Sequence, residues 1–287
     1  MSIQRYFLGC PVWNERRWTG RLFAPDTRPA DYLRQYAAIF NSVEGNSTFY
    51  GLPRPEAVER WREETPPGFQ FCCKFPRTVS HELRLRAAEE ETQQFLKLMA
   101  RLEERAGVLF LQLPPDFDGS GLPALAAYLQ ALPDEFRYAV ELRHPDWFDK
   151  GECERRLHDL LRNRAMDRVV LDSRALFSAP PEDEATRIAQ GKKPRVPVHA
   201  VALGAHPLVR FIGRHAVQAN EPFLLPWVAK VAQWIDEGRQ PYVFLHTPDN
   251  HYAPDQARRF HELLAQQVAG LGELPPPPPA ETQLGLF

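Results

Sequence analysis

Val43-Glu44-Gly45-Asn46-Ser47-Thr48-Phe49-Tyr50 is the stretch that decides the fold, because polar groups here follow a short apolar run and precede Gly51-Leu52-Pro53. A carboxylate, an amide, two hydroxyls and a phenol stand within these eight residues, and packing alone gives no reason to place them there. A barrel enzyme carries such groups where its strands end, at the mouth of the pocket. The stretch therefore predicts a strand whose end contributes to a site.

The same rhythm of apolar run, polar residues and helical pattern recurs along the chain. The interiors of the apolar runs are mostly apolar rather than alternating, which is typical of parallel strands covered on both faces. Amphipathic stripes such as Leu33, Tyr36, Ala37 and Phe40 lie between them. The pattern predicts an α/β fold, a single-domain (β/α)8 TIM-type barrel. Its strands are expected at 6–9, 39–44, 69–74, 108–113, 138–142, 168–172, 208–212 and 242–246.

Two segments interrupt the rhythm and suggest how the chain is divided. Residues 178–199 follow the sixth predicted strand and hold a basic cluster at Lys192, Lys193 and Arg195. They are expected to form a lid or wall over the strand ends, or else a solvated loop without a role. Prolines 275–279 would form a stiff spacer. We expect a barrel domain at 1–270 and a spacer with a peptide tail at 271–287.

Composition limits the function classes. The chain has 287 residues, is 44% hydrophobic and 25% charged, and carries a net charge of -2. This charge excludes a uniformly basic surface that coats nucleic acid, but it permits a local basic cleft. Its four cysteines form no C-x-x-C pair, which fits a reducing cytosol. No apolar run approaches the roughly 18 residues of a membrane span, so a cytoplasmic protein without a membrane partner is predicted.

Five ordered motifs together resemble one family. They are Gly9–Trp13 with 18–20; 43–50 with 52–53; 71–74 with 76–77 and 80–81; 141–144 with Trp147; and 246–250 with 253–254. This combination resembles the YecE-like family, catalogued as a domain of unknown function, over roughly residues 5 to 268. The resemblance implies a TIM-type barrel with a polar cleft at the carboxyl ends of its strands. The family carries no settled activity.

Polar and aromatic groups at the ends of the predicted strands are the candidate site residues, because a barrel gathers these ends on one face. Candidate catalytic residues are Glu44, Glu141, His144, Asp172 and His246. Candidate ligand-binding residues are Trp13, Asn46, Tyr50, Lys74, Gln112, Arg143, Arg210 and Asn250.

The roles of these groups follow from their chemistry. Glu44 and Glu141 could divide the roles of general acid and base, or each could be neutralised in an ion pair by Lys74 or Arg143. Arg143 and Lys74 suit a phosphate or carboxylate, which favours an anionic ligand. The aromatic residues near the rim could stack on a sugar or base, or could seal the top of the barrel.

A divalent metal is chemically possible, but the spacing does not indicate one. The histidines and carboxylates among the candidate catalytic residues are suitable ligand types. The chain has no H-E-x-x-H and no D-x-D arrangement among them. A cofactor therefore stays unassigned.

Gln283-Leu284-Gly285-Leu286-Phe287 resembles the pentapeptide by which bacterial DNA polymerases and repair proteins dock on the replication sliding clamp. Leu286 and Phe287 can fill an apolar pocket, Gln283 can form hydrogen bonds, and the proline spacer keeps the segment accessible. Alternatively, Leu284, Leu286 and Phe287 fold back onto the helices of the barrel.

Three functions remain open from the sequence. The first is a hydrolase that acts on a phosphate-bearing ligand, such as damaged DNA or a nucleotide. The second is a non-catalytic adaptor bound to the sliding clamp, and the third is a barrel enzyme that acts on a sugar or sugar acid. No G-x-S-x-G elbow, Walker loop or G-x-G-x-x-G after a strand is present, which disfavours serine hydrolases, P-loop enzymes and dinucleotide enzymes.

Overall fold

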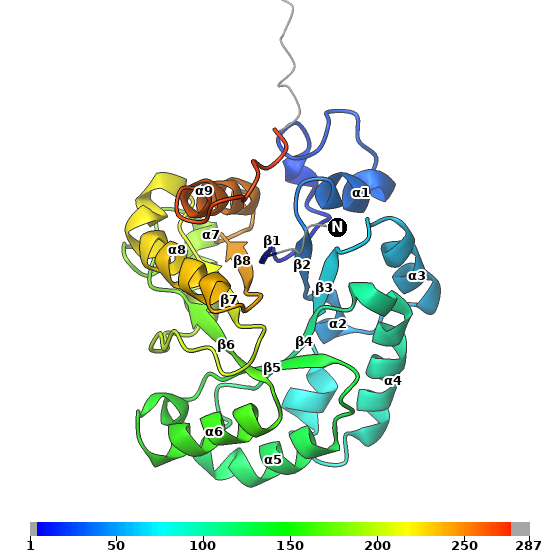
Figure 1. Ribbon diagram of the computed structural model, residues 1–287, viewed down its shortest axis with the longest axis vertical. Coiled ribbons are helices and arrows are strands. Elements are labelled where there is room, and N and C mark those ends of the chain that lie inside the picture. Colours follow the sequence, from blue (N-terminus) through cyan, green and yellow to red (C-terminus); the bar gives the residue numbers. More distant parts are fainter. Residues whose placement is uncertain (1–4, 277–287) are drawn as a thin grey trace, which may run out of the picture.

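The computed structural model describes residues 5–276, and strands alternate with helices throughout this range (Figure 1). The strands are β1 Phe7–Gly9, β2 Ser42–Gly45, β3 Gln70–Cys73, β4 Val108–Gln112, β5 Arg137–Glu141, β6 Asp167–Asp172, β7 Leu208–Ile212 and β8 Tyr242–His246. The α-helices are α1 Tyr32–Ala37, α2 Ser47–Tyr50, α3 Pro55–Glu63, α4 Glu89–Met99, α5 Leu122–Ala131, α6 Glu152–Asn163, α7 Glu184–Lys192, α8 Glu221–Asp236 and α9 Ala253–Ala265. All eight predicted strands form, and the α/β class is confirmed.

The prediction of a closed (β/α)8 TIM-type barrel is wrong. Six strands form one curled parallel sheet in the order β1-β8-β7-β6-β5-β4, and β2 and β3 form a separate two-stranded parallel sheet. A closed barrel would require every strand to pair with two neighbours. The ladder is instead interrupted on both sides of the small sheet, between β1 and β2 and between β3 and β4.

Side chains replace the ladder between β1 and β2. The Tyr36 hydroxyl accepts a hydrogen bond from the Cys10 amide at 2.7 Å and donates one to the Ser42 carbonyl at 2.9 Å. The Asn41 side chain accepts from the Leu8 amide at 2.7 Å. These groups satisfy backbone donors and acceptors that would otherwise pair across the two strands. The phenol of Tyr36 and the amide of Asn41 therefore bind backbone groups at this junction in place of a strand ladder.

Glycine keeps the two sheets close at this junction. A Cβ atom at Gly9 would lie 2.1 Å from the Ser42 carbonyl oxygen, which is far inside van der Waals contact. On the other side of the small sheet, the isolated bridges Phe71↔Ala106 and Lys74↔Phe110 join the segments of β3 and β4 in place of a continuous ladder.

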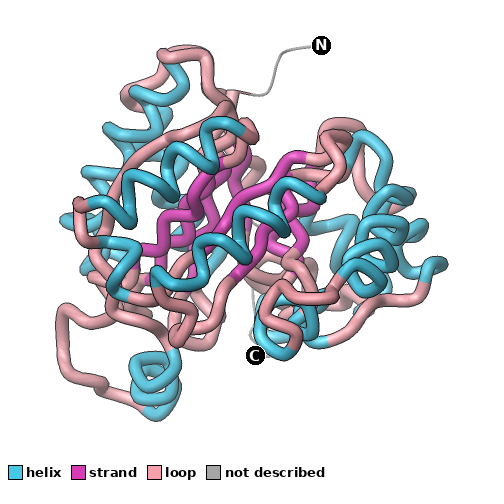
Figure 2. The backbone as a smooth tube through the Cα atoms, turned by 90° about the horizontal axis from the view of Figure 1, so that it is seen from below, coloured by secondary structure: helices cyan, strands magenta, loops and turns pink. Residues whose placement is uncertain are grey.

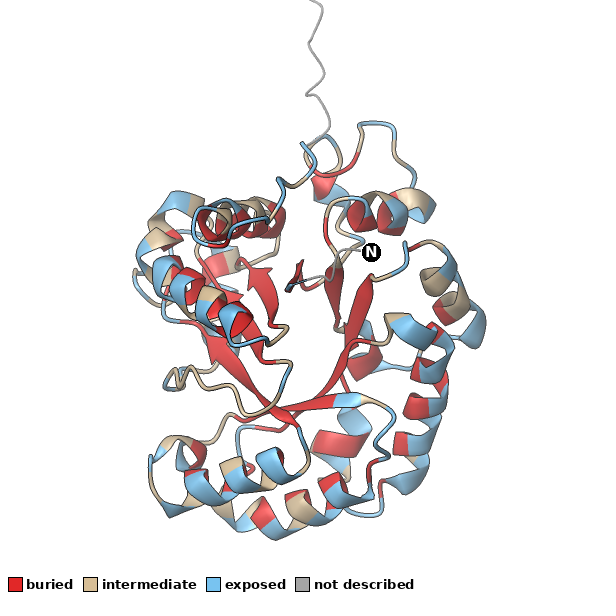
Figure 3. Ribbon diagram, in the orientation of Figure 1, coloured by how far each residue is buried: buried red, intermediate tan, exposed pale blue. Residues whose placement is uncertain are grey.

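Helices cover the outer faces of the sheets, and an apolar cluster fills the inner side. Figure 2 shows the strands at the centre with helices around them, and Figure 3 shows buried strands and helices buried on the side that faces them. The inner cluster consists of Phe7, Cys72, Val108, Phe110, Ala139, Val169, Leu208, Tyr242 and Phe244. Along each strand these residues alternate with others that face the helices.

The chain after α9 returns along that helix. Arg5 donates to the Ala269 carbonyl at 2.7 Å, and Arg258 donates to the Pro275 carbonyl at 2.5 Å. His261 is 2.6 Å from the Gly272 carbonyl. The predicted division at residue 270 stays a prediction, and residues 277–287 lie outside the described chain. Within residues 5–276, no helix is long and apolar enough to cross a bilayer.

Candidate functional site

The period of the strands sets which polar side chains face inward at their carboxyl ends. In β3, β4, β5, β7 and β8, the strand or its immediate continuation carries a polar residue two positions beyond an inner apolar residue. These pairs are Cys72 and Lys74, Phe110 and Gln112, Ala139 and Glu141, Leu208 and Arg210, and Phe244 and His246. All five polar residues are buried. Together with Glu44, Asn46 and Arg143 they form the polar cluster.

Arg210 joins the two carboxylates at the centre of the polar cluster. Its Nε lies 2.8 Å from Glu44 Oε2, and its Nη2 lies 2.6 Å from Glu44 Oε1, a bidentate pair. Its Nη1 also donates to Glu141 Oε2. The side chain of Arg210 is 3% exposed and both carboxylates are 0% exposed, so this triad is removed from water. Buried charges of this kind are tolerated only when they are paired.

The pairing keeps both carboxylates ionised. Burial raises the pKa of Glu44, but the nearby Arg210 and His246 lower it further, so this pKa lies well below its ordinary value. Burial likewise opposes ionisation of Glu141, yet Arg210 and Arg143 hold its pKa at about 2. Both groups are therefore anions at neutral pH, and neither is available as a general acid.

A second arm of the polar cluster leads from Glu141 to Lys74. Arg143 Nε lies 2.8 Å from Glu141 Oε1, and Arg143 Nη2 lies 2.7 Å from Gln112 Oε1. The same Gln112 oxygen accepts a hydrogen bond from Lys74 Nζ at 3.0 Å. The amine of Lys74 thus has a neutral partner, and no ion pair to a carboxylate is formed by Lys74 within residues 5–276.

Lys74 sits in apolar surroundings that disfavour its charge. Its Nζ lies 5.0 Å from the Phe49 ring centroid and 5.4 Å from that of Phe110. Burial and then the positive charge of Arg210 lower the pKa of Lys74 to about 7. Lys74 is therefore a buried amine that exchanges its proton near neutral pH.

His246 and Asn46 complete the contacts of Glu44. His246 Nε2 lies 2.9 Å from Glu44 Oε2, and Asn46 Nδ2 donates to Glu44 Oε1 at 2.6 Å. Burial lowers the pKa of His246 to about 4, even though Glu44 attracts a proton to it. The imidazole is therefore neutral at pH 7 and donates through Nε2 to the carboxylate.

Asp172 lies at the end of β6 but faces the helices rather than the polar cluster. Its carboxylate accepts from Trp227 Nε1 of α8 at 2.7 Å and from Arg174 Nη2 at 2.7 Å. The residues before it on β6 explain this direction, because Val169 belongs to the inner cluster and Asp172 is three positions further on.

Four other candidates also stand apart from the polar cluster. His144 caps the short helix that follows it, through a 3.3 Å contact with the Asp146 amide. Trp13 packs edge-on against Trp61 and Phe71. Tyr50 is 84% exposed. Asn250 has a positive φ of 64°, and its carbonyl accepts from Trp18 Nε1.

Lys193 is a neighbour of the polar cluster that the sequence did not single out as a site residue. It follows α7, and its amine interacts electrostatically with Arg210, Glu44, Arg143 and Glu141. The only signal in the sequence was its place in the basic cluster of the long segment after β6.

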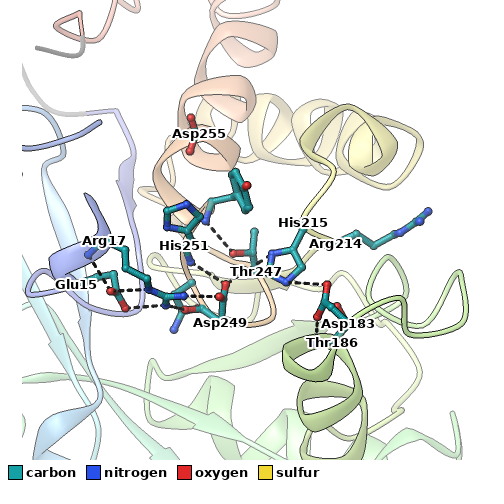
Figure 4. A network of polar contacts seen from close by, with 12 residues as sticks. Glu15, Arg17, Asp183, Thr186, Arg214, His215, Thr247, Asp249, His251 and Asp255 are labelled. Atoms are coloured by element: carbon teal, nitrogen blue, oxygen red, sulfur yellow. Dashed lines mark hydrogen bonds and ion pairs between the residues drawn. The ribbon is translucent and has the colours of Figure 1, made fainter. Parts of the chain in front are cut away.

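Charged contacts tie together the loops that surround the strand ends (Figure 4). Arg17, after β1, donates to Asp249 Oδ2 at 2.5 Å and to the Asp249 carbonyl at 2.7 Å. His215, after β7, lies 3.6 Å from Asp249 and 3.5 Å from Asp183. Asp183 in turn caps α7 through the Thr186 amide at 2.7 Å. The loops after β1, β6, β7 and β8 therefore form one connected rim.

A metal site is not apparent in the described chain. Between residues 5 and 276, no three or more histidine, cysteine or acidic side chains are arranged to hold a metal ion. The acidic groups of the polar cluster are bound by guanidinium groups instead.

Comparison with known proteins places this geometry in a family. The model of a protein family of unknown function, DUF72, matches residues 7–283. The chain is 45% identical over 269 residues to the UPF0759 protein YecE of Escherichia coli K12, covering 94% of this chain and 96% of the relative. It is 24% identical to the UPF0759 protein YunF of Bacillus subtilis 168, covering 98% and 99% of the two chains.

Solved structures of the same family share the fold. A crystal structure of a DUF72 family protein from Thermotoga maritima matches with a TM-score of 0.69 and 23% identity, covering 90% of this chain and 98% of that one. A DUF72 family protein from Enterococcus faecalis V583 matches with a TM-score of 0.65 and 18% identity, covering 91% and 94%.

Proposed function

The chain belongs to the DUF72 family, and within that family of unknown function we propose that its polar cluster is the active site of a hydrolase for a phosphate-bearing ligand. The observation that carries the proposal is an excess of buried cationic groups. Glu44 and Glu141 are bound by guanidinium groups, whereas Lys74 has no acidic partner in the described chain. A buried cation without a counter-charge favours an anion beside it.

The contacts suggest a division of roles within the cluster. Lys74 and Arg143 both reach the oxygen of Gln112, so their cationic groups lie close enough to share one phosphate. Lys74, a buried amine without an acidic partner in the described chain, is suited to bind this phosphate as a cation. Glu44 and Glu141 are assigned to holding Arg210, in place of the acid–base roles expected from the sequence.

The test is turnover of a panel of phosphate esters, with and without divalent metal ions. The panel contains phosphomonoesters, phosphodiesters, nucleotides and duplexes with an abasic site. We expect the wild type to hydrolyse at least one member and Lys74→Met to lose at least about a hundredfold in kcat/KM, as is typical when a group that stabilises developing negative charge is removed.

Lys97→Met is the matched control, because Lys97 is exposed on α4 and belongs to an outer helix. Its kcat/KM should stay within twofold of wild type, because substitutions at exposed positions usually change free energies by no more than ~0.5 kcal/mol. Absence of wild-type turnover on every member would refute the hydrolase proposal. Stabilisation by sugars or sugar acids alone would then favour the small-molecule enzyme.

We also propose that Gln283, Leu284, Leu286 and Phe287 dock on a bacterial sliding clamp. The motif, which lies outside the described residues, and the proline spacer before it support this proposal. Tethering would raise the local concentration of the protein at DNA without any intrinsic affinity for DNA. It is compatible either with a hydrolase or with a non-catalytic adaptor.

Binding of the full-length protein to a purified sliding clamp tests the tail. Wild type is expected to bind with micromolar or tighter affinity, and Leu286→Ala/Phe287→Ala is expected to lose binding because two apolar anchors are removed. Equal binding of both proteins would show that another surface is responsible. An adaptor without activity would bind the clamp and hydrolyse none of the phosphate esters.

A further inference from the structure

The segment between β6 and β7 is docked on the strand ends rather than extended into solvent. Leu176 and Ala189 of this segment form one buried cluster with Leu171 of β6 and Ile212 of β7. The Ser173 hydroxyl, next to the end of β6, donates to the Pro194 carbonyl at 2.8 Å. Residues 193 and 194 are thus held beside the carboxyl end of β6.

Lys193 carries the positive charge of this segment toward the polar cluster. Its amide donates to the Ala189 carbonyl at 2.9 Å, which fixes the backbone at the end of α7. Its half-buried side chain interacts electrostatically with Glu44, Glu141 and the two guanidinium groups. In the described chain its amine forms neither a hydrogen bond nor an ion pair.

The neighbouring basic residues of the segment behave differently. Arg195 lies over the Phe177 ring with its guanidinium carbon 4.1 Å from the centroid. Lys192 is exposed. Lys193 is therefore the member of this basic cluster whose amine interacts electrostatically with the charges of the site.

The charges around the polar cluster do not balance without a ligand. Two carboxylates, Glu44 and Glu141, are bound by two guanidinium groups. Lys74 and Lys193 add two amines, one bound only to the neutral Gln112 and the other unpaired among the described residues. The buried amine of Lys74 and the half-buried amine of Lys193 lose part of their solvation, which an anion of charge two would replace.

We propose that Lys193 and Lys74 together bind the dianionic phosphate group of the ligand, with Lys193 reaching it from the segment between β6 and β7. This inference rests on the proposed function, because it assumes that the ligand carries phosphate. The proposal adds Lys193, which lies outside the strands, to the ligand-binding residues. The segment between β6 and β7 would then form one wall of the site. Ligand binding then ties that segment to the sheets through a new pair of ionic contacts.

Titration calorimetry with inorganic phosphate tests the proposal on the full-length protein. We expect wild type to bind phosphate and Lys193→Met to weaken the dissociation constant by about tenfold, a typical loss for one charge-assisted hydrogen bond. Lys193→Arg should retain most of the affinity because the charge is kept. Lys192→Met removes the same charge one residue away and should bind as wild type does.

Two results would overturn the inference. Equal phosphate affinity in Lys193→Met and wild type would show that Lys193 does not contact the anion. Equal losses in Lys193→Met and Lys192→Met would show a general charge effect instead of a specific contact. Neither result would contradict the hydrolase proposal. That proposal is tested separately, by measuring whether the phosphate esters are hydrolysed and whether hydrolysis depends on Lys74.

Discussion

Replacing Arg210 with methionine is expected to destabilise the protein by about 3–5 kcal/mol at pH 7, because the two carboxylates that it pairs would be left buried with incomplete compensation. Arg210 makes both hydrogen bonds of the bidentate pair with Glu44 and one to Glu141. Urea denaturation monitored by circular dichroism gives the free energy of unfolding. A loss below about 1 kcal/mol would contradict this account of the triad, since exposed pairs lose that little.

A triple variant provides the control for Arg210→Met. Adding Glu44→Gln and Glu141→Gln removes both charges, so stability should recover toward wild type. This variant keeps the test decisive even if the single variant fails to fold.

The pH dependence of the wild type follows from the same contacts. Because the pKa of Glu141 is lowered to about 2, its ion pairs stabilise the fold fully above about pH 4.5 and are lost as the pH falls toward 2. In Arg210→Met the buried carboxylates should hold protons more readily. The difference between this variant and wild type should therefore shrink as the solution is acidified.

Lys74→Met is expected to stabilise the protein at pH 7, by on the order of 3 kcal/mol. The pKa of Lys74 falls from 10.5 to about 7 on folding. The unfolded chain therefore binds the proton more tightly, and the charged amine opposes folding. Methionine has a similar length without the charge, so the opposing contribution disappears while the apolar contacts with Phe49 and Phe110 are kept.

The sign of this effect can be checked against pH. Wild type should gain stability as the pH rises from about 7 to about 10.5, where the unfolded chain releases the same proton. Lys74→Met should lack this gain, and its advantage should disappear at high pH. Greater stability of wild type at pH 7 would mean that the bond to Gln112 outweighs the cost of burial. A gain in stability together with lost turnover would identify Lys74 as a residue kept for function.

The sequence predicted the strands well because each combines an apolar run with a turn or helix signal. β7 and β8 form with the predicted bounds, whereas β2 begins at Ser42 instead of residue 39. The interruption between β1 and β2 could not be predicted, because it depends on the directions of the Tyr36 and Asn41 side chains. Tyr36 was identified only as part of an apolar stripe, yet its hydroxyl occupies the junction between β1 and β2.

The inward position of a candidate residue could be predicted where the period of the strand was followed. Glu141 and Arg210 stand two residues beyond inner apolar residues, and both lie in the polar cluster. Asp172 was selected for its place at a strand end, although counting from Val169 would have put it on the helix side. Lys193 was not identified as a site residue, because its segment has no periodic pattern and its position depends on how that segment packs on the strands.

The pairing of β1 has a consequence for how the protein is made. β1 forms its ladder with β8, so Phe7 is matched to Tyr242 across almost the whole chain. On the ribosome the first strand cannot form its ladder until the last strand has emerged. Such non-local pairing slows folding and exposes a strand edge to other chains. Nascent chains that stop before β8 therefore have a first strand without its ladder partner.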